Sequence, residues 1–278
     1  MVLRKMLTLV ETPWQTATVW LLIGAIFFAM RSCEYLETNT KEEDRRTNIL
    51  RLRNIIFKTN GKTISHSSPR LQSAQIVMII FEYQKNDKRD VQVHMFKTSD
   101  SVLNPVIAWA NTVKRVWSYP NSSEDSKVCE LLDEHNKMTT IKSSHVRDYL
   151  KSIITLIGED TLGFTAEDAG LHSIRSGGAM AMFLSKTPVI IMMRVGRWSS
   201  EAFLEYIREQ VQDFTVGISE NMIQFESFFN MNRSSNPVSE DMISIDNENG
   251  PETVEFQIEF SQLALTNNSG MNFRSNRN

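Results

Sequence analysis

An unbroken apolar run near the N-terminus constrains the fold more than any other feature of the chain. Residues 16–30 read TATVWLLIGAIFFAM and carry no charge. Such a run must be buried in a protein core or in a membrane, and crossing a bilayer takes about 20 apolar residues. Glu11 and Gln15 stand where the apolar part of a signal peptide would build up. We therefore expect a core helix that ends at Arg31 and no membrane contact. A membrane anchor is the alternative, which cell fractionation would reveal.

The length and composition of the chain indicate a globular protein. Of its 278 residues, 41% are hydrophobic and 23% are charged, which suits one large domain or two small ones with a buried core. A coiled coil, a collagen and a wholly disordered chain are excluded. Two cysteines, Cys33 and Cys129, cannot build a disulfide framework, and no histidines are spaced to complete a zinc site. We expect an intracellular protein, nuclear if its source is a eukaryote, that holds no metal and no cofactor.

The net charge of −3 hides an uneven distribution. Residues 240–278 contain seven acidic side chains and two arginines and so carry −5, which leaves +2 for residues 1–239. Residues 41–62 alone hold seven basic side chains against three acidic ones. A mildly basic body with an acidic tail is compatible with DNA binding without requiring it. A solvated surface is the other interpretation of the basic stretch.

Hydrophobic patterning divides the body into strands followed by helices. Residues 49–57 and 75–83 are rich in β-branched and aromatic side chains, and residues 91–96 alternate, so all three are predicted to be strands. A polar connection predicts a hairpin over 76–96 with Lys85 at its shoulder. The fold class expected is mixed α+β and mainly α-helical, with a small antiparallel sheet. Apolar spacing predicts helices from Pro105 and over 143–157, 172–184, 188–195, 200–214 and 216–229.

The C-terminal part of the chain differs from the rest. From Asn232 onward, asparagine, serine and acidic residues dominate. Low hydrophobicity of this kind is typical of disordered segments. We expect one domain over residues 1–229 and an acidic, disordered tail over residues 230–278.

The most informative segment is GLHSIRSGGAMAM, residues 170–182. His172 and Arg175 are three residues apart and therefore project from one turn of a helix. The small residues that follow allow another element to approach closely, so we expect the start of this helix to be buried beside a site. Arg31 and Glu34 have the same spacing earlier in the chain, where an ion pair at a helix end is the ordinary interpretation.

A second motif, GRWSSEAFLEYIR, begins at Gly196. It places Trp198 in a turn and Tyr206 on the predicted helix that follows. Taken singly, a tryptophan in a turn and a tyrosine on a helix are packing residues more often than functional ones.

Together and in this order, these residues resemble the catalytic pattern of the tyrosine recombinases, the phage-integrase family. The resemblance covers about residues 15–229. The motif sequences are most similar to those of recombinases from eukaryotic mobile elements of the DIRS and Crypton type. It implies the fold of a recombinase catalytic domain. The site residues that it implies are Arg31, Lys85, His172, Arg175, Trp198 and Tyr206, with Glu34 orienting the arginine or the histidine.

The resemblance implies that the protein cuts and rejoins DNA without metal or ATP. Tyr206 would attack a phosphodiester and hold the DNA as a 3′-phosphotyrosine, while Lys85 would protonate the leaving 5′ oxygen. Arg31 and Arg175 would clamp the phosphate, because a planar guanidinium can engage two oxygens at once. His172 would take the tyrosine proton or hold the phosphate. Trp198 would occupy the position at which the family has a hydrogen-bond donor to the phosphate.

The partners that the resemblance implies are double-stranded DNA and other copies of the chain. Family members act as tetramers joined by exchange of a C-terminal segment, and residues 216–229 are the candidate for that segment here. The side chains that we expect to bind DNA are Arg51, Arg53, Lys58, Lys88 and Arg89.

The sequence departs from the family pattern in two respects. Trp198 precedes Tyr206 by eight residues, whereas nine residues is the commonest spacing in the family and would place Arg197 at this site position. We assign the position to Trp198, because the motif Gly-Arg-Trp is typical of the mobile-element recombinases. Only about 30 residues precede Arg31, so we expect the N-terminal DNA-clamping domain of the family to be missing. An inactive DNA-binding remnant of a mobile-element recombinase is therefore the alternative function, and it predicts salt-dependent binding without a covalent adduct.

Overall fold

The apolar run forms α2 (Pro13–Phe27), the central helix of the core. Its first turn is closed by a capping box, in which the Thr12 side chain accepts a hydrogen bond from Gln15 N and the Gln15 side chain accepts one from Thr12 N. Residues on all sides of the helix are buried, which confirms the predicted core helix. The helix ends four residues before the predicted end at Arg31, because Ala29 takes a left-handed backbone conformation with φ 42°.

The computed structural model describes residues 2–40, 47–83 and 89–198. The chain divides into two units, Met1–Val216 and Gly217–Asn278, and all of the described residues lie in the first. The predicted tail over residues 230–278 and the predicted helices over 200–214 and 216–229 lie outside the described residues.

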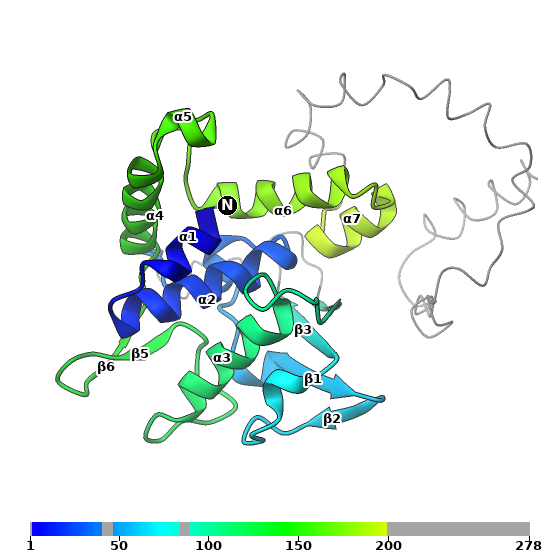
Figure 1. The fold of residues 1–278 in the computed structure, drawn as a ribbon. Helices are drawn as coiled ribbons and strands as arrows, with labels where there is room; N and C mark the ends of the chain where they lie inside the picture. Colours follow the sequence, from blue (N-terminus) through cyan, green and yellow to red (C-terminus); the bar gives the residue numbers. More distant parts are fainter. Residues whose placement is uncertain (1, 41–46, 84–88, 199–278) are drawn as a thin grey trace, which may run out of the picture. The chain divides into compact units, whose positions relative to one another are not determined.

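Three helices pack around α2, namely α1 (Val2–Thr8), α3 (Pro105–Trp117) and α6 (His172–Leu184) (Figure 1). The approach of α3 is close because Gly24 has no side chain. A Cβ atom at Gly24 would lie 2.8 Å from the indole of Trp109, which is fully buried in the core. α4 (Ser143–Ile157) packs on α1, and the 3₁₀ helix η4 (Leu71–Ser73) packs on α3.

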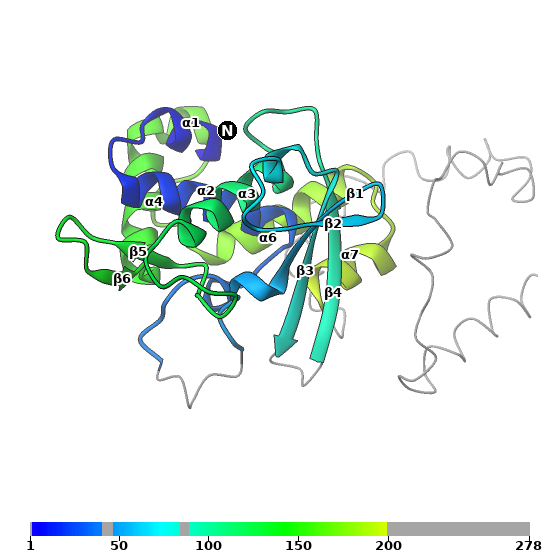
Figure 2. The same ribbon diagram turned by 90° about the horizontal axis from the view of Figure 1, so that it is seen from below.

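A four-stranded antiparallel sheet packs on α3 in the strand order β2-β1-β3-β4 (Figure 2). Phe57, Val77, Ile79, Phe81 and Val93 are buried on one face and attach the sheet to the core. The strands are β1 (Ile55–Thr59), β2 (Lys62–Ile64), β3 (Ile76–Tyr83) and β4 (Arg89–Phe96).

The pairing of β3 with β4, from Ile76 opposite Phe96 to Tyr83 opposite Arg89, confirms the predicted hairpin. The predicted strand over 49–57 is wrong in its first half, where Leu52–Asn54 forms the 3₁₀ helix η3. Arg51 N donates to the side chain of Asn54 there, so that only an isolated antiparallel bridge of Arg51 with Lys127 remains of the predicted strand before Ile55.

The helices predicted over 143–157 and 172–184 begin and end at the predicted residues, and the helix predicted from Pro105 is α3. The fold class is therefore mixed α+β and mainly helical, with a small antiparallel sheet. Among the described residues, no helix is both long and apolar enough to cross a membrane. The remaining elements are η1 (Ser32–Glu34), β5 (Glu130–Leu132), β6 (Met138–Thr140), α5 (Glu159–Leu162) and α7 (Val189–Gly196).

Candidate functional site

The turn that follows α2 joins Arg31 to Glu34. Glu34 lies in η1 rather than in a continuation of α2, and its carboxylate turns back to accept a hydrogen bond of 2.8 Å from Arg31 N. Its second oxygen lies 3.3 Å from Nη1 of the Arg31 guanidinium. The Glu34 side chain is fully buried, whereas the Arg31 side chain is 26% exposed. The turn thus presents one partly exposed cation above a buried anion.

Arg175 reaches the same turn from α6. Its guanidinium donates to the carbonyl oxygen of Ala29 and, at 2.6 Å, to that of Gly196. Gly178 makes this approach possible, because a Cβ atom at that position would collide with the carbonyl oxygen of Ile26. The small residues after Arg175 therefore do what the sequence predicts, and they let α6 pack closely against the end of α2. Arg175 is 1% exposed.

Trp198 covers the Arg175 guanidinium from the end of α7. The guanidinium carbon lies 4.6 Å from the centre of the Trp198 ring, within the range of a cation–π interaction. The ring folds back over Gly196, where a Cβ atom would overlap it. Any larger residue at position 196 would therefore displace Trp198 from Arg175.

Arg197 is a buried residue of the site, although the sequence pattern favours its neighbour Trp198. Its Nη2 lies 2.7 Å from the carboxylate of Glu34, and neither side chain is exposed. Burial lowers the pKa of Arg197, while Glu34 opposes that shift. The one signal in the sequence is the spacing of nine residues to Tyr206, which is the commonest spacing in the family that the sequence resembles and which selects position 197.

His172 begins α6, and its side chain is exposed. Partial desolvation lowers the pKa of its imidazole, and the positive charges of Arg175 and Arg31 lower it further. The effect of both arginines on one ring places His172 within electrostatic range of each. An imidazole that is neutral at neutral pH can accept a proton, which is the state that a general base requires.

The structure thus gathers five of the residues that the sequence singles out, together with Arg197, around residues 28–34. Lys85, Lys88 and Tyr206 lie outside the described residues. Among the described residues, no three histidine, cysteine, aspartate or glutamate side chains are grouped so that they could hold a metal ion. The gathered five are Arg31, Glu34, His172, Arg175 and Trp198.

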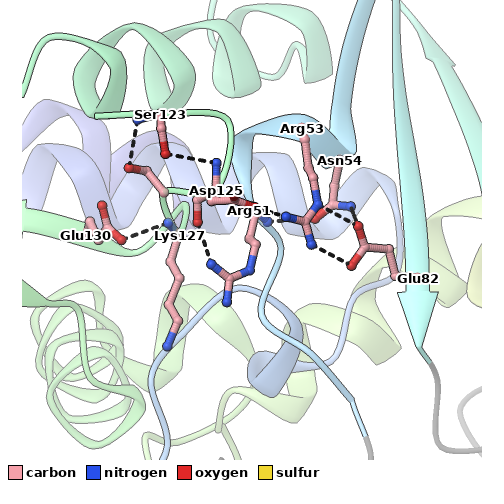
Figure 3. A network of polar contacts seen from close by, with 9 residues as sticks. Arg51, Arg53, Asn54, Glu82, Ser123, Asp125, Lys127 and Glu130 are labelled. Carbon is pink, nitrogen blue, oxygen red and sulfur yellow. Dashed lines mark hydrogen bonds and ion pairs between the residues drawn. The ribbon is translucent and has the colours of Figure 1, made fainter. Parts of the chain in front are cut away.

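Two of the arginines expected to bind DNA belong to a network of polar contacts (Figure 3). Arg53 forms ion pairs with Glu82, at 2.9 Å, and with Asp125. Arg51 donates to the main-chain oxygen of Asp125 at 2.6 Å. Asn54 also donates to Glu82, and these partners lower the pKa of the Glu82 carboxyl, Arg53 most strongly. The network ties η3 to the end of β3 and to residues 122–126.

The other described residues of that set lie on the sheet. Arg89 in β4 places its guanidinium 5.0 Å from the centre of the ring of Tyr83, its partner in the strand pairing. Lys58 in β1 is close enough to His94 for its charge to lower the pKa of that imidazole, although burial is the larger cause. Their contact with DNA stays a prediction.

Two crystal structures of the XerH site-specific recombinase are similar to this chain. The complex with palindromic difH substrate after cleavage has a TM-score of 0.47 and 15% identity, over 79% of this chain and 50% of that chain. The complex with difH substrate before cleavage has a TM-score of 0.45 and 14% identity, over 74% and 47%. The chain spans about half the length of these recombinase chains. Neither a protein-family model nor a curated protein sequence matches it.

Proposed function

We propose that this chain is the catalytic part of an enzyme that cuts and rejoins DNA through a 3′-phosphotyrosyl intermediate. The observation that carries the proposal is the gathering of two guanidinium groups and an indole around the turn after α2, with the His172 imidazole, whose pKa is lowered, within electrostatic range of both arginines. Transfer of a phosphoryl group to a tyrosine without metal needs cations for the phosphate oxygens and a proton acceptor for the nucleophile. Arg31, Arg175 and His172 supply these groups.

The proposed reaction needs two further residues, Tyr206 and Lys85. The phenol oxygen of Tyr206 attacks the phosphorus while His172 takes its proton. The bond from phosphorus to the 5′ oxygen breaks, and Lys85 gives that oxygen a proton. The reverse steps rejoin the strand, and because the phosphotyrosine conserves the bond energy, no ATP is consumed.

A trapping experiment tests the nucleophile. The full chain is incubated with nicked duplexes of randomised central sequence, and complexes that resist SDS are digested and analysed by mass spectrometry. We expect DNA on the peptide that contains Tyr206 and no adduct from Tyr206→Phe. Tyr149→Phe is the matched control. Tyr149 lies on α4, where its ring packs against Trp14 of α2, so this variant should retain the adduct. An adduct formed by Tyr206→Phe would show that another group is the nucleophile.

The burial of Arg175 favours a second candidate, a DNA-binding protein without catalysis. Both of its terminal nitrogens donate to main-chain oxygens, and its side chain is almost inaccessible. In this case the wild-type chain binds duplex DNA in a salt-dependent way and forms no adduct with any sequence in the pool.

The proposed enzyme assembles on DNA as a tetramer through residues 216–229, which lie outside the described residues. An apolar hollow of about 780 Å³ beside α6 offers an acceptor for such a segment. Ile26, Phe27, Ile154 and Met180 are among the residues that line it. Size-exclusion chromatography with light scattering, with and without DNA, tests this assembly.

A further inference from the structure

Arg197 occupies an environment that is costly for a cation. It follows α7 in a left-handed conformation with φ 57°, and its side chain is fully buried. The guanidinium carbon lies 3.7 Å from the centre of the Phe81 ring on β3. Nη1 donates to the main-chain oxygens of Phe28, at 2.9 Å, and Val195, at 3.0 Å. A charged side chain held in this way, without contact to solvent, requires a compensating partner.

That partner, Glu34, is shared between two arginines. The contact of its carboxylate with Arg197 is 2.7 Å, and that with the Arg31 guanidinium is 3.3 Å. The three side chains together carry one net positive charge. Because the carboxylate and Arg197 are both fully buried, they balance each other, and the surplus charge belongs to the partly exposed Arg31. Coulomb interactions are several times stronger at such a site than in water.

The main-chain contacts add a geometric argument. Arg197 binds the carbonyl oxygen of Phe28, and Arg175 binds that of the next residue, Ala29. Two buried guanidinium groups from different elements therefore hold adjacent peptide units at the end of α2. Arg31 follows two residues after Ala29 and takes its position from this turn.

We infer that Arg197 is a positioning residue for the proposed phosphate site, because it balances Glu34 and leaves the charge of Arg31 to act on a phosphate. The inference rests on the proposed function for the identity of the anion. It differs from a packing role in one respect: the effect of losing Arg197 must be reversed by removing the charge of Glu34.

Three variants test this charge balance, with His172 as the reporter. Arg197→Met lowers the local net charge by one, Glu34→Gln raises it by one, and the double variant restores the wild-type value. The pKa of His172 is measured by NMR titration and assigned among the five histidines with His172→Gln. We expect it to rise in Arg197→Met, to fall in Glu34→Gln and to return in the double variant, because each substitution changes the local net charge by one.

Loss of one partner of a buried ion pair is strongly destabilising, so the single variant Arg197→Met could fail to fold, and the test does not depend on it alone. If it does not fold by circular dichroism, the comparison of Glu34→Gln with the double variant decides the outcome. The inference is overturned if adding Arg197→Met to Glu34→Gln leaves the pKa of His172 unchanged. It is supported if the pKa returns to the wild-type value.

Adduct formation separates this inference from the proposed function. If the wild-type chain forms the adduct, we expect Arg197→Met to slow it by about 10²–10³, as for loss of an oxyanion donor, and the double variant to recover at least tenfold. A wild-type rate in Arg197→Met would overturn the inference and leave the proposed function standing. If the wild-type chain forms no adduct, the proposed enzymatic function fails, and the His172 titration still decides the role of Arg197.

Discussion

Arg175 and Arg31 carry the same charge in different surroundings. Arg175 is buried, binds two main-chain oxygens and is covered by Trp198. Arg31 is partly exposed, and its guanidinium makes one long contact with Glu34. Arg175 therefore joins α2, α6 and α7 in addition to any role in binding phosphate, whereas Arg31 contributes little to the packing.

Replacement of each arginine by lysine separates these roles. A single ammonium cannot bind both carbonyl oxygens while lying flat on Trp198, so Arg175→Lys should lower the free energy of unfolding by about 2–3 kcal/mol. Arg31→Lys is the matched control and should cost less than about 1 kcal/mol, because lysine keeps the charge and the Arg31 guanidinium makes only a long contact of 3.3 Å with Glu34. Urea unfolding followed by circular dichroism measures both values. Equal costs would contradict the structural role of Arg175.

His172 should make stability depend on pH. Its pKa in the folded protein lies below the usual value of about 6.5, so the unfolded chain binds more protons as the pH falls past that value. The free energy of unfolding should therefore decrease as the pH drops from about 6.5 through the folded-state pKa. His94, whose pKa is also lowered, contributes in the same direction.

Urea unfolding between pH 7.5 and 5 measures this slope. The slope should be shallower in His172→Gln and in His94→Gln than in the wild-type chain, and shallowest in the double variant. An unchanged slope in His172→Gln would mean that the imidazole is protonated equally in the folded and unfolded states.

The contact between α6 and α2 depends on one of two adjacent glycines. A Cβ atom at Gly178 would collide with the main chain at Ile26, whereas one at Gly177 would meet only the end of the Ile26 side chain, at 3.8 Å. Backbone cannot move aside as a side chain can. The two positions therefore differ in what they tolerate, although they are neighbours in one helix.

Alanine at each position is a matched test of this contact. Gly178→Ala should lower the free energy of unfolding by about 1–3 kcal/mol, because α6 must shift away from α2. Gly177→Ala should raise it by about 0.5–1 kcal/mol, because alanine is favoured over glycine in a helix. Thermal unfolding monitored by circular dichroism distinguishes the two signs. The packing described for α6 is wrong if both variants are stabilised.

The distribution of charge along the chain bears on DNA affinity. Residues 240–278 carry −5, which opposes the +2 of residues 1–239 wherever the tail comes near DNA. Replacing the seven acidic residues of the tail by their amides should therefore tighten binding to duplex DNA several-fold at low salt. Because this effect is electrostatic, it should shrink as the salt concentration rises. Fluorescence anisotropy over a salt series measures it, and a gain that persists at high salt would point to a non-electrostatic cause.

Much of the fold follows from local patterns in the sequence. The core helix, the β3–β4 hairpin, α4 and α6 are predictable because hydrophobic periodicity and turn residues act within a few positions of each other. The same reasoning places His172 and Arg175 on one helical turn. It fails at the end of α2, where the backbone conformation of Ala29 ends the helix early. It also fails at residues 49–54, where the side chain of Asn54 interrupts the predicted strand.

The long-range partners within the candidate site were decided by tertiary structure, whereas the pairing of Arg31 with Glu34 follows from their spacing of three residues. Glu34 and Arg197 are 163 positions apart, and Arg175 and Ala29 are 146 apart, so no local spacing relates them. The sequence by itself determined which residues could do the chemistry, because residue type sets charge and hydrogen-bonding capacity. Folding decided which arginine is buried against Glu34 and which faces solvent, because desolvation depends on the elements that pack around each side chain.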